Sequence, residues 1–457
     1  MTDFDVIVFG GGTGNTVASA AAAEGFETAL IEKGPIGGLC LNRGCNPSKM
    51  LIQHATVANT IRDADRFGID ANIEEVHFGD LVREVNDELA DIAESKKEQK
   101  RSENNLTLYQ EKARFVDDHT IEIADSGETH TGERVVIAAG SKPVVPGAID
   151  GLQEVDYLTS DDALKLEAVP DEFVIVGGGY IAAELGYYFG SFGSDVTVIE
   201  AEDTLVPRED GDVAAAFTEI AGGRHDVYTG YRASAVTESA GEITVTAEAE
   251  DGTEVEVAGE ELLVALGRRP NTEGIDLDAT GVATNDAGFI ETDEQLRTNV
   301  EEVWAMGDVA DNGMYKHSGD YEGEIVIENV AHDGSREADF TALPHAVFTE
   351  PQIGAVGKTE AQLDEEGREY VVGRAEFTDT AMSRALKLDE GFAKVLADPE
   401  TREILGCHII GHEASMLVHE VTPAMRYGAT VDGLANTLIH VHPAMSKVVM
   451  KACKDVS

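Results

Sequence analysis

Cysteine and basic residues are both scarce in this chain. Only four cysteines occur in 457 residues, which is too few for a framework of structural disulfides. Lys and Arg number 34 against 87 Asp and Glu, so the formal net charge is −53. This shortage of positive charge argues against nucleic acid as a partner. The acids are spread along the whole chain, so a disordered acidic tail does not explain them.

The acidic surface predicts a cytoplasmic protein from an extreme halophile. Repulsion between so many carboxylates would destabilise a compact fold in dilute salt, whereas molar salt screens it within a few ångström. No apolar run approaches the about 18 residues that a membrane-spanning helix needs. Asp3 and Asp5 stand where a signal peptide would carry Lys or Arg. We therefore expect no membrane association and no export.

Two segments look like copies of one unit, in a chain long enough for two or more domains. Residues 4–32 and 173–200 each contain an apolar strand, a glycine turn, a helix and a second strand that ends in an acid. The acids, Glu32 and Glu200, follow their turns by about 20 residues, as in the dinucleotide-binding fingerprint. In such a turn the backbone approaches a pyrophosphate at the positive end of the helix. The third fingerprint glycine is replaced in both copies, by Asn15 and Ala182.

Two of the four cysteines, Cys40 and Cys45, lie five positions apart between glycines. A metal site would need further ligands nearby, and none is at a compatible spacing. Two free structural thiols and a redox-active pair are the other interpretations. The run Pro47-Ser48-Lys49 favours the redox pair, because it indicates a helix start, where a thiolate is stabilised.

Three shorter segments of the chain also combine an apolar run with glycine. Residues 135–141, 263–271 and 303–308 each read as a buried strand that ends in a glycine turn. The segment 83–101, rich in Glu and Lys, predicts a long exposed helix. From about residue 343 onward, strands and helices alternate without glycine turns of this kind, which indicates a further domain.

The run from Gly37 to Leu51 resembles the active-site signature of the pyridine nucleotide-disulfide oxidoreductases. The other motifs follow in that family's order over essentially the whole chain, including Gly267-Arg268-Arg269-Pro270-Asn271 and His440-Val441-His442-Pro443. The resemblance implies an α/β fold with two Rossmann-like domains, for FAD and NAD(P), and a C-terminal α+β dimerisation domain. The expected bounds are 1–147 and 271–340 for the two parts of the FAD domain, 148–270 for the NAD(P) domain and 341–457 for the dimerisation domain.

The resemblance also implies roles for individual residues. Cys45 would lie against the flavin as the charge-transfer thiolate, and Cys40 would be the interchange thiol that attacks the substrate. Lys49 would approach the flavin N5 and pair with Glu184. His442 would come from the partner subunit of a homodimer as general acid–base, a task that suits histidine near neutral pH.

The remaining implied roles concern the cofactors, and no metal is expected. Tyr180 would cover the nicotinamide pocket until the cofactor enters, Asp308 would hold the ribityl chain, and Glu32 would hold the adenosine ribose. The expected FAD contacts are Gly10, Gly12, Thr13, Gly14, Glu32, Lys33, Gly38, Lys49, Ala113, Ala139, Gly140 and Asp308. The expected NAD(P)H contacts are Gly177, Gly179, Tyr180, Ile181, Glu184, Glu200 and Gly267.

One position departs from the family pattern. Members usually carry Glu five residues after the catalytic histidine, where it orients the imidazole. Here that position is Lys447, which cannot accept an imidazole N–H and would repel a protonated ring. We therefore expect Lys447 to turn outward and another acceptor to orient His442.

The substrate is expected to be bis-γ-glutamylcystine, which the enzyme would reduce to γ-glutamylcysteine. Glutathione reductases hold the glycine carboxylate of their substrate with an arginine, and Ala20 stands at that position. The run from Cys40 to Cys45 resembles mycothione reductase. Dihydrolipoamide dehydrogenase is the alternative. Glutathione reductase, mercuric reductase and a flavoprotein such as an NADH oxidase that does not act on disulfides fit less well. Mercuric reductases need a C-terminal cysteine pair, and only Cys453 is found there.

The choice between NADH and NADPH stays open at this stage. Glu200 and Glu202 follow the second strand of the NAD(P) unit, and a carboxylate suits the ribose diol of NADH. Thiol-disulfide reductases of this kind generally use NADPH, and Arg208 is a candidate to offset the acids.

Overall fold

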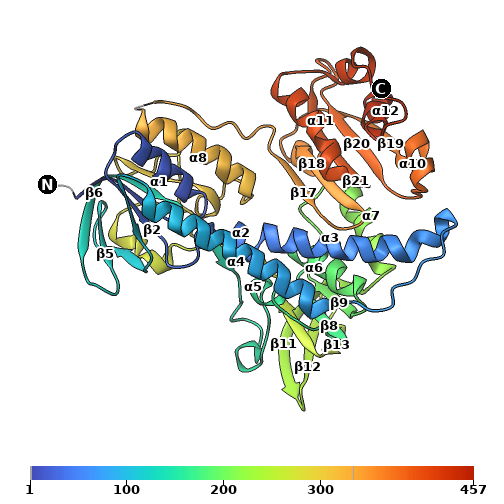
Figure 1. Cartoon of the computed structure of the whole chain (residues 1–457). Helices are drawn as coiled ribbons and strands as arrows, with labels where there is room; N and C mark the ends of the chain where they lie inside the picture. The colour runs from blue at the N-terminus through green and yellow to red at the C-terminus, as the bar shows by residue number, and fades with distance from the viewer. Residues whose placement is uncertain (1–2, 333, 457) are drawn as a thin grey trace. The chain divides into compact units, whose positions relative to one another are not determined.

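The computed structural model describes residues 3–332 and 334–456 (Figure 1). These residues form two compact units. Unit 1 comprises Met1–Ser48, Asp80–Val144 and Gly267–Phe340, and unit 2 comprises Lys49–Gly79, Val145–Leu266 and Thr341–Ser457. One unit boundary therefore falls inside a helix, between Ser48 and Lys49.

Unit 1 is built on one sheet with the strand order β3-β2-β1-β6-β5-β4, with β16 paired to β6. The strands β1, β2, β3, β6 and β16 are parallel, and β4 and β5 add an antiparallel edge. The bounds are β1 (Phe4–Phe9), β2 (Thr28–Ile31), β3 (Leu106–Tyr109), β4 (Ala113–Phe115), β5 (Thr120–Ile123), β6 (Thr129–Ile137) and β16 (Val303–Ala305). The apolar runs 6–9 of β1 and 29–31 of β2 are buried, as expected for strands that are covered on both faces.

Helices α1 (Gly14–Ala23) and α8 (Lys316–Ala331) pack side by side in unit 1 (Figure 1). The short helix α2 (Gly38–Arg43) precedes α3 (Cys45–Arg62), and a small ladder joins β7 (Ser141–Pro143) to β15 (Arg268–Pro270). The helix expected at 83–101 exists as α4 (Phe78–Ser102), and most of its residues are exposed as predicted, although one face is buried. Val82, Val85 and Leu89 form a buried stripe along it, because its apolar residues recur at helical spacing among the charges.

Unit 2 contains a second parallel sheet in the order β10-β9-β8-β14. An antiparallel sheet follows in the order β11-β12-β13. The strands are β8 (Glu172–Val176), β9 (Asp195–Glu200), β10 (Asp226–Thr229), β11 (Tyr231–Ser239), β12 (Glu242–Ala249), β13 (Glu254–Gly259) and β14 (Glu261–Val264). The helices of this part are α5 (Ser160–Ala163), α6 (Tyr180–Ser191) and α7 (Gly211–Gly222).

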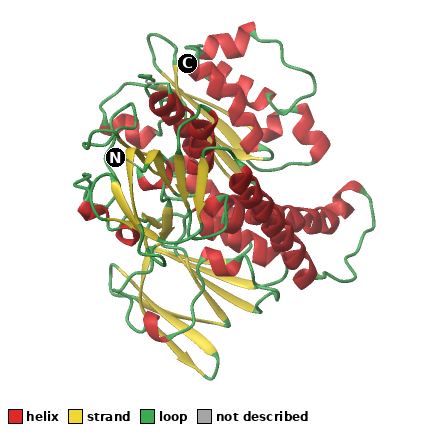
Figure 2. Cartoon of the chain, turned by 60° about the vertical axis from the view of Figure 1, so that its left-hand side comes forward, coloured by secondary structure: helices red, strands yellow, loops and turns green. Residues whose placement is uncertain are grey.

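The C-terminal part of unit 2 is a five-stranded antiparallel sheet in the order β17-β18-β21-β20-β19. Its strands are β17 (Pro344–Val347), β18 (Gln352–Gly357), β19 (Val371–Glu376), β20 (Phe392–Ala397) and β21 (Ile404–Gly411). Its helices are α9 (Glu360–Glu365), α10 (Ala381–Leu386), α11 (Ala414–Arg426) and α12 (Lys447–Asp455). Helices flank the sheets of both units (Figure 2), so the predicted α/β class, with two glycine-turn sheets and a C-terminal α+β part, is confirmed. Among the described residues no helix combines the length and apolar composition needed to span a bilayer.

Candidate active site

The first glycine turn follows β1 in unit 1. Gly10 has φ +106°, and a Cβ there would lie 2.1 Å from the carbonyl oxygen of Ala138, so only glycine fits. A Cβ on Gly38 would lie 2.6 Å from Cα of Gly12, so these two backbones approach each other closely. Bare backbone at the start of a helix is the cradle that a pyrophosphate needs.

Glu32 closes this cradle from the end of β2. Its carboxylate accepts hydrogen bonds from the backbone N–H groups of Gly11 and Gly34, each at 2.7 Å. The glutamate therefore stands where the dinucleotide fingerprint places the acceptor for ribose hydroxyls. Gln110 Oε1 is also buried there and has no hydrogen-bond partner among the described residues, although its amide donates to Gly34. Both observations fit a bound FAD.

Cys40 lies in α2, and Cys45 begins α3, as the sequence predicted for a helix start. Both are half-buried and are not joined by a disulfide in this structure. The hydrogen bond with Cys45, together with burial, raises the pKa of Cys40. Cys40 therefore holds its proton more firmly than an ordinary thiol does.

Ser141 connects a second group of polar residues in unit 1. Its hydroxyl donates to Asp308 Oδ2 at 2.6 Å and accepts from Arg268 Nε at 2.8 Å. Burial raises the pKa of Asp308, although Ser141 and Arg268 partly offset that effect. The neighbouring turn is held by Asn271, whose amide donates to the Ala139 carbonyl at 2.9 Å. These contacts bring together the Ala-Gly strand end, the Gly-Arg-x-Pro-Asn turn and the Gly-Asp strand of the sequence analysis.

Glu322 on α8 is a buried carboxyl group that the sequence analysis missed. It accepts a hydrogen bond from the backbone N–H of Gly307, next to Asp308. Burial raises its pKa to about 7, and the charge of Asp308 acts in the same direction. No motif marks this residue, because its burial depends on the packing of α8 in unit 1.

The second glycine turn, in unit 2, repeats the geometry of the first. Gly177 has φ +110°, and a Cβ there would lie 2.5 Å from the carbonyl oxygen of Ala265. Glu200 at the end of β9 accepts hydrogen bonds from the backbone N–H of Gly178 and, at 2.8 Å, from that of Glu202. The turn therefore offers a second dinucleotide site with the same carboxylate acceptor.

Lys49 and Glu184 meet in unit 2, as the resemblance implied. The Lys49 ammonium lies 2.6 Å from Glu184 Oε2 and 5.1 Å from the ring centroid of Phe348. The other carboxylate oxygen of Glu184 accepts from the Phe348 backbone N–H at 3.0 Å. Glu184 is therefore bonded on both oxygens and fixes the position of the lysine.

Tyr180, one turn before Glu184 on α6, has partners that the sequence did not predict. Its hydroxyl donates to Glu209 Oε1 at 2.6 Å, and His345 Nε2 lies 2.8 Å from the same oxygen. Glu209 follows β9, and His345 belongs to β17, so the three side chains come from distant parts of the sequence.

His442 is exposed and lies just before α12. No residue that the structure describes forms a hydrogen bond with its imidazole. Lys447 opens α12 and is half-buried. The acceptor expected to replace the missing glutamate is not found among the described residues. Two residues before His442, the Nε2 atom of His440 lies 2.5 Å from Oε1 of Glu420 on α11, a contact that the sequence analysis missed.

The segment around His442 exposes large apolar side chains. Leu438 is 52% exposed, Ile439 99% and Val441 74%. An apolar surface beside a candidate catalytic histidine is the feature expected where a second subunit binds.

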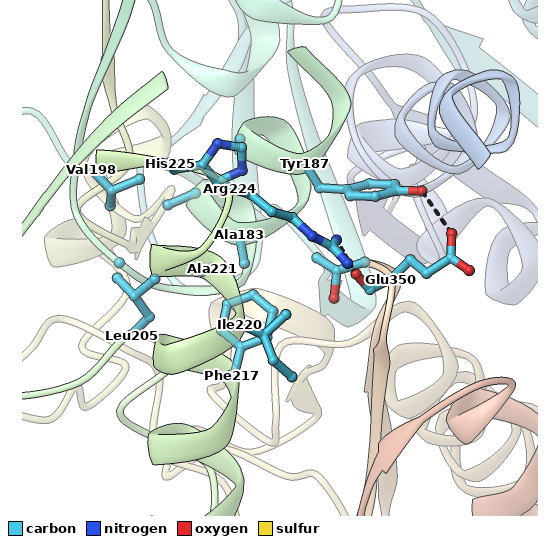
Figure 3. Close-up of a pocket in the computed structure, with 14 residues that line it drawn as sticks. Ala183, Tyr187, Val198, Leu205, Phe217, Ile220, Ala221, Arg224, His225 and Glu350 are labelled. Atoms are coloured by element: carbon cyan, nitrogen blue, oxygen red, sulfur yellow. Dashed lines mark hydrogen bonds between the residues drawn. The ribbon is translucent and has the colours of Figure 1, made fainter. Parts of the chain in front are cut away.

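A small cavity in unit 2 lies between α6, α7 and β9 (Figure 3). It measures about 20 Å³, which is room for one water molecule. Its wall includes Leu205, Phe217 and His225, and burial lowers the pKa of His225 to about 4. By this volume the cavity could hold a water molecule but not a disulfide substrate.

The remaining predicted cofactor residues are placed as follows. Thr13 and Gly14 start α1, Lys33 is exposed after β2, Ala113 opens β4, Gly140 follows β6, Gly179 precedes α6, and Ile181 lies in α6. Gly267 lies at the edge of unit 1, where its carbonyl accepts from the Val144 N–H at 2.9 Å.

Comparison with known proteins gives consistent matches over almost the whole chain. The pyridine nucleotide-disulphide oxidoreductase model matches residues 4–329, and the dimerisation domain of that family matches residues 343–453. Dihydrolipoyl dehydrogenase 3 of Haloarcula marismortui is 37% identical over 99% of this chain and 96% of its own length. Mycothione reductase of Mycobacterium tuberculosis is 35% identical over 99% of each chain.

A solved structure shows the same fold. The HOCl-induced flavoprotein disulfide reductase RclA from Escherichia coli matches with a TM-score of 0.86 and 26% identity over 99% of both chains. The family implies FAD and NAD(P)H as cofactors, and its dimerisation domain is present here. With a family model over most of its length and relatives above 30% identity across nearly all of it, this chain belongs to the pyridine nucleotide-disulphide oxidoreductase family and is a flavoprotein disulfide oxidoreductase.

Proposed function

We propose that this enzyme exchanges electrons between NAD(H) and the dihydrolipoamide–lipoamide pair through FAD and the Cys40–Cys45 disulfide. The observation that carries the disulfide chemistry is the pair of hydrogen-bonded thiols at the junction of α2 and α3. It lies in the same unit as the glycine cradle closed by Glu32. FAD, when bound, would exchange a hydride with the nicotinamide and an electron pair with the cysteines.

The chain's own residues perform the interchange. In the direction of disulfide reduction, the Cys40 thiolate attacks one sulfur of the substrate disulfide, and a mixed disulfide forms while one substrate thiolate leaves. Cys45 then attacks the Cys40 sulfur, the second substrate thiolate leaves, and the Cys40–Cys45 disulfide forms again. The protein pair loses two electrons and the substrate gains two. His442 of the partner subunit would supply and remove the protons at the substrate sulfur.

The curated relatives favour dihydrolipoamide over bis-γ-glutamylcystine, the substrate expected from the sequence. Dihydrolipoyl dehydrogenases of three halophiles match at 37–38% identity over 99% of this chain. Their shared habitat also fits the formal charge of −53.

Bis-γ-glutamylcystine is the second candidate, on one specific observation. Ala20 on α1 carries no charge to hold a glycine carboxylate, and γ-glutamylcysteine has none. The 35% identity to a mycothione reductase also supports a substrate other than lipoamide.

NADH is the nicotinamide that the geometry of unit 2 supports. The Gly178 N–H donates to the Glu200 carboxylate and holds it where the dinucleotide fingerprint places the acceptor for ribose hydroxyls. The negative charge of this carboxylate would repel the 2′-phosphate of NADPH. Arg208 is exposed, and the structure gives it no ion pair with Glu200 or Glu202 among the described residues.

A substrate panel at molar salt tests these assignments. We expect NAD⁺-linked oxidation of dihydrolipoamide to exceed reduction of bis-γ-glutamylcystine and of oxidised glutathione by at least about ten-fold in kcat/KM. If the enzyme instead preferred bis-γ-glutamylcystine, that disulfide would be its substrate in place of dihydrolipoamide. If the wild type turned over none of these disulfides, and Cys40→Ser kept full NADH oxidase activity, both candidates would be rejected.

The homodimer is tested by solution mass at molar salt. The exposed side chains of Leu438, Ile439 and Val441 would be covered by a second copy, so Ile439→Glu should shift the enzyme towards monomer. Because His442 would act across that interface, interchange activity should fall with the dimer fraction while FAD stays bound.

A further inference from the structure

We propose that Glu209 and His345 form a latch that holds Tyr180 over the nicotinamide pocket and thereby sets the affinity for the nicotinamide ring. This inference rests on the proposed nicotinamide site of unit 2. In it, Tyr180 is the side chain that moves, and Glu209 and His345 are positioning residues.

The contacts of the latch converge on one oxygen. Tyr180 Oη lies 2.6 Å and His345 Nε2 lies 2.8 Å from Glu209 Oε1, and the Tyr180 and His345 rings stack with centroids 5.9 Å apart. The Glu209 side chain is completely buried. Burial opposes its ionisation, but the hydrogen bond and charge of His345, with the Tyr180 hydroxyl, lower the pKa of Glu209. Tyr180 is therefore held by a buried, charged acceptor, which gives a stronger bond than a neutral one.

The glutamate is fastened to the glycine turn. Val206 donates its backbone N–H to the Gly178 carbonyl at 2.7 Å, and Glu209 donates its own to the Val206 carbonyl at 2.9 Å. Val206 has φ +46°, a left-handed conformation that is rare for a β-branched residue and is found where surrounding structure enforces it. The latch therefore keeps a fixed place relative to the nucleotide turn and does not follow Tyr180 when the ring moves.

His345 makes the release of Tyr180 possible. When the tyrosine leaves, His345 still donates to Glu209, so opening breaks one hydrogen bond and does not leave a buried carboxylate unpaired. Opening would be harder without the histidine and easier without the tyrosine hydroxyl. The two partners of one carboxylate oxygen thus act on nicotinamide affinity with opposite signs.

The test compares two ligands by calorimetry on the oxidised, FAD-loaded enzyme at molar salt. NAD⁺ requires the ring of Tyr180 to move, whereas ADP-ribose lacks nicotinamide and does not. Tyr180→Phe should bind NAD⁺ about ten-fold more tightly, because a hydrogen bond to a charged group no longer opposes opening. Its affinity for ADP-ribose should stay within about two-fold of the wild type.

His345→Ala should act in the opposite direction. We expect NAD⁺ affinity to fall about ten-fold with ADP-ribose unchanged, and His345→Gln, which keeps a side-chain N–H donor, should restore it to within about three-fold. In a Tyr180→Phe background the His345→Ala effect should disappear, since no hydrogen bond to Tyr180 is left to break. Tyr187→Phe is the matched control, because Tyr187 lies on the same helix and donates to another glutamate, Glu350, at 3.3 Å. It should change neither affinity.

The outcomes separate the latch from the site on which it rests. If the wild-type enzyme bound neither ADP-ribose nor NAD⁺, the nicotinamide site proposed for unit 2 would be wrong, and the latch with it. If ADP-ribose bound normally but Tyr180→Phe and His345→Ala changed NAD⁺ affinity in the same direction, or not at all, the site would stand and the latch would be wrong.

Discussion

The two glycine turns of this chain have the same backbone geometry in different surroundings. Gly10 and Gly177 have φ +106° and +110°, and each would bring a Cβ against a carbonyl oxygen of the neighbouring strand end. Glu32 and Glu200 both accept the N–H of the middle glycine of their turn. The repeat seen in the sequence is therefore a repeat of hydrogen bonds as well as of residue types.

The buried carboxyl groups near the turns differ between the units. In unit 1, burial raises the pKa of Asp308 and of Glu322. In unit 2, basic neighbours outweigh burial and lower the pKa of Glu209 and of Asp210. Unit 1 thus keeps carboxyl groups that burial makes harder to ionise, whereas unit 2 keeps paired carboxylates.

The largest effects on cofactor binding should come from adding a Cβ to each glycine turn in separate variants. We expect Gly10→Ala to be purified with less than about a tenth of the wild-type flavin, because the new Cβ would clash with backbone in a left-handed conformation. Gly177→Ala should keep its flavin and lose ADP-ribose affinity by about a hundred-fold or more. Flavin absorbance measures the cofactor content, and calorimetry measures the affinity for ADP-ribose.

Gly25→Ala is the matched control for this pair. Gly25 also has a positive φ, +98°, but an added Cβ would meet no atom within 4 Å. It should therefore retain both flavin and ADP-ribose binding. Loss of flavin in Gly177→Ala would show that the two turns are not independent sites.

A pH-dependent stability difference should come from Glu322. The pKa of Glu322 in the folded protein is about 7 against an ordinary 4.5. The folded state therefore holds a proton that the unfolded state loses, and the free energy of unfolding falls as pH rises from about 4.5 to 7. Glu322→Gln should remove this penalty and gain about 3 kcal/mol at pH 8 but little at pH 4.

Urea unfolding across that range at molar salt measures the effect. Glu324→Gln, an exposed change on the same helix, should give no comparable pH dependence. A Glu322→Gln variant that is less stable than the wild type at pH 8 would contradict the assignment.

Effects of intermediate size should come from neutralising Glu200 and Glu32, the two carboxylates placed to accept ribose hydroxyls. Glu200→Gln should lower the ratio of kcat/KM for NADH over NADPH about ten-fold, because a neutral amide no longer repels a 2′-phosphate. Glu32→Gln should leave that ratio unchanged and weaken FAD instead. The Glu200→Gln effect should shrink as salt rises. A ratio that does not respond to Glu200→Gln would place nicotinamide selection elsewhere.

The smallest effect concerns the third fingerprint position. The Asn15 amide donates to the carbonyls of Gly11 and Gly12, whereas the corresponding Ala182 makes no such bond and is buried. Asn15→Ala should cost about 1 kcal/mol of unfolding free energy with flavin retained. Urea titration measures it, and a loss above about 3 kcal/mol would show that the asparagine has a further role.

Local patterns account for what the sequence could predict. The strands, both glycine turns and the helix start at Cys45 depend on neighbouring residues and their periodicity. The Lys49–Glu184 pair came from family resemblance and not from local pattern. The buried face of α4 was missed because the many charges of that segment masked its apolar stripe.

The contacts missed are those between distant segments. Glu209 and His345 are 136 positions apart, and nothing near either residue marks the other. The Glu420–His440 pair and the burial of Glu322 likewise depend on how helices pack. Polar contacts between distant segments leave no periodic pattern in the sequence, so they could not be predicted from it.

The central claim is that Cys40 and Cys45 form one redox-active disulfide coupled to the flavin. Anaerobic titration of the holoenzyme with NADH, followed by flavin absorbance and thiol counting, tests it directly. The wild type should accept twice as many electrons as Cys40→Ser, with one pair on the flavin and one on the cysteines, and should show a thiolate–flavin charge-transfer absorption. Equal electron uptake by the wild type and Cys40→Ser, without that absorption in the wild type, would contradict the account.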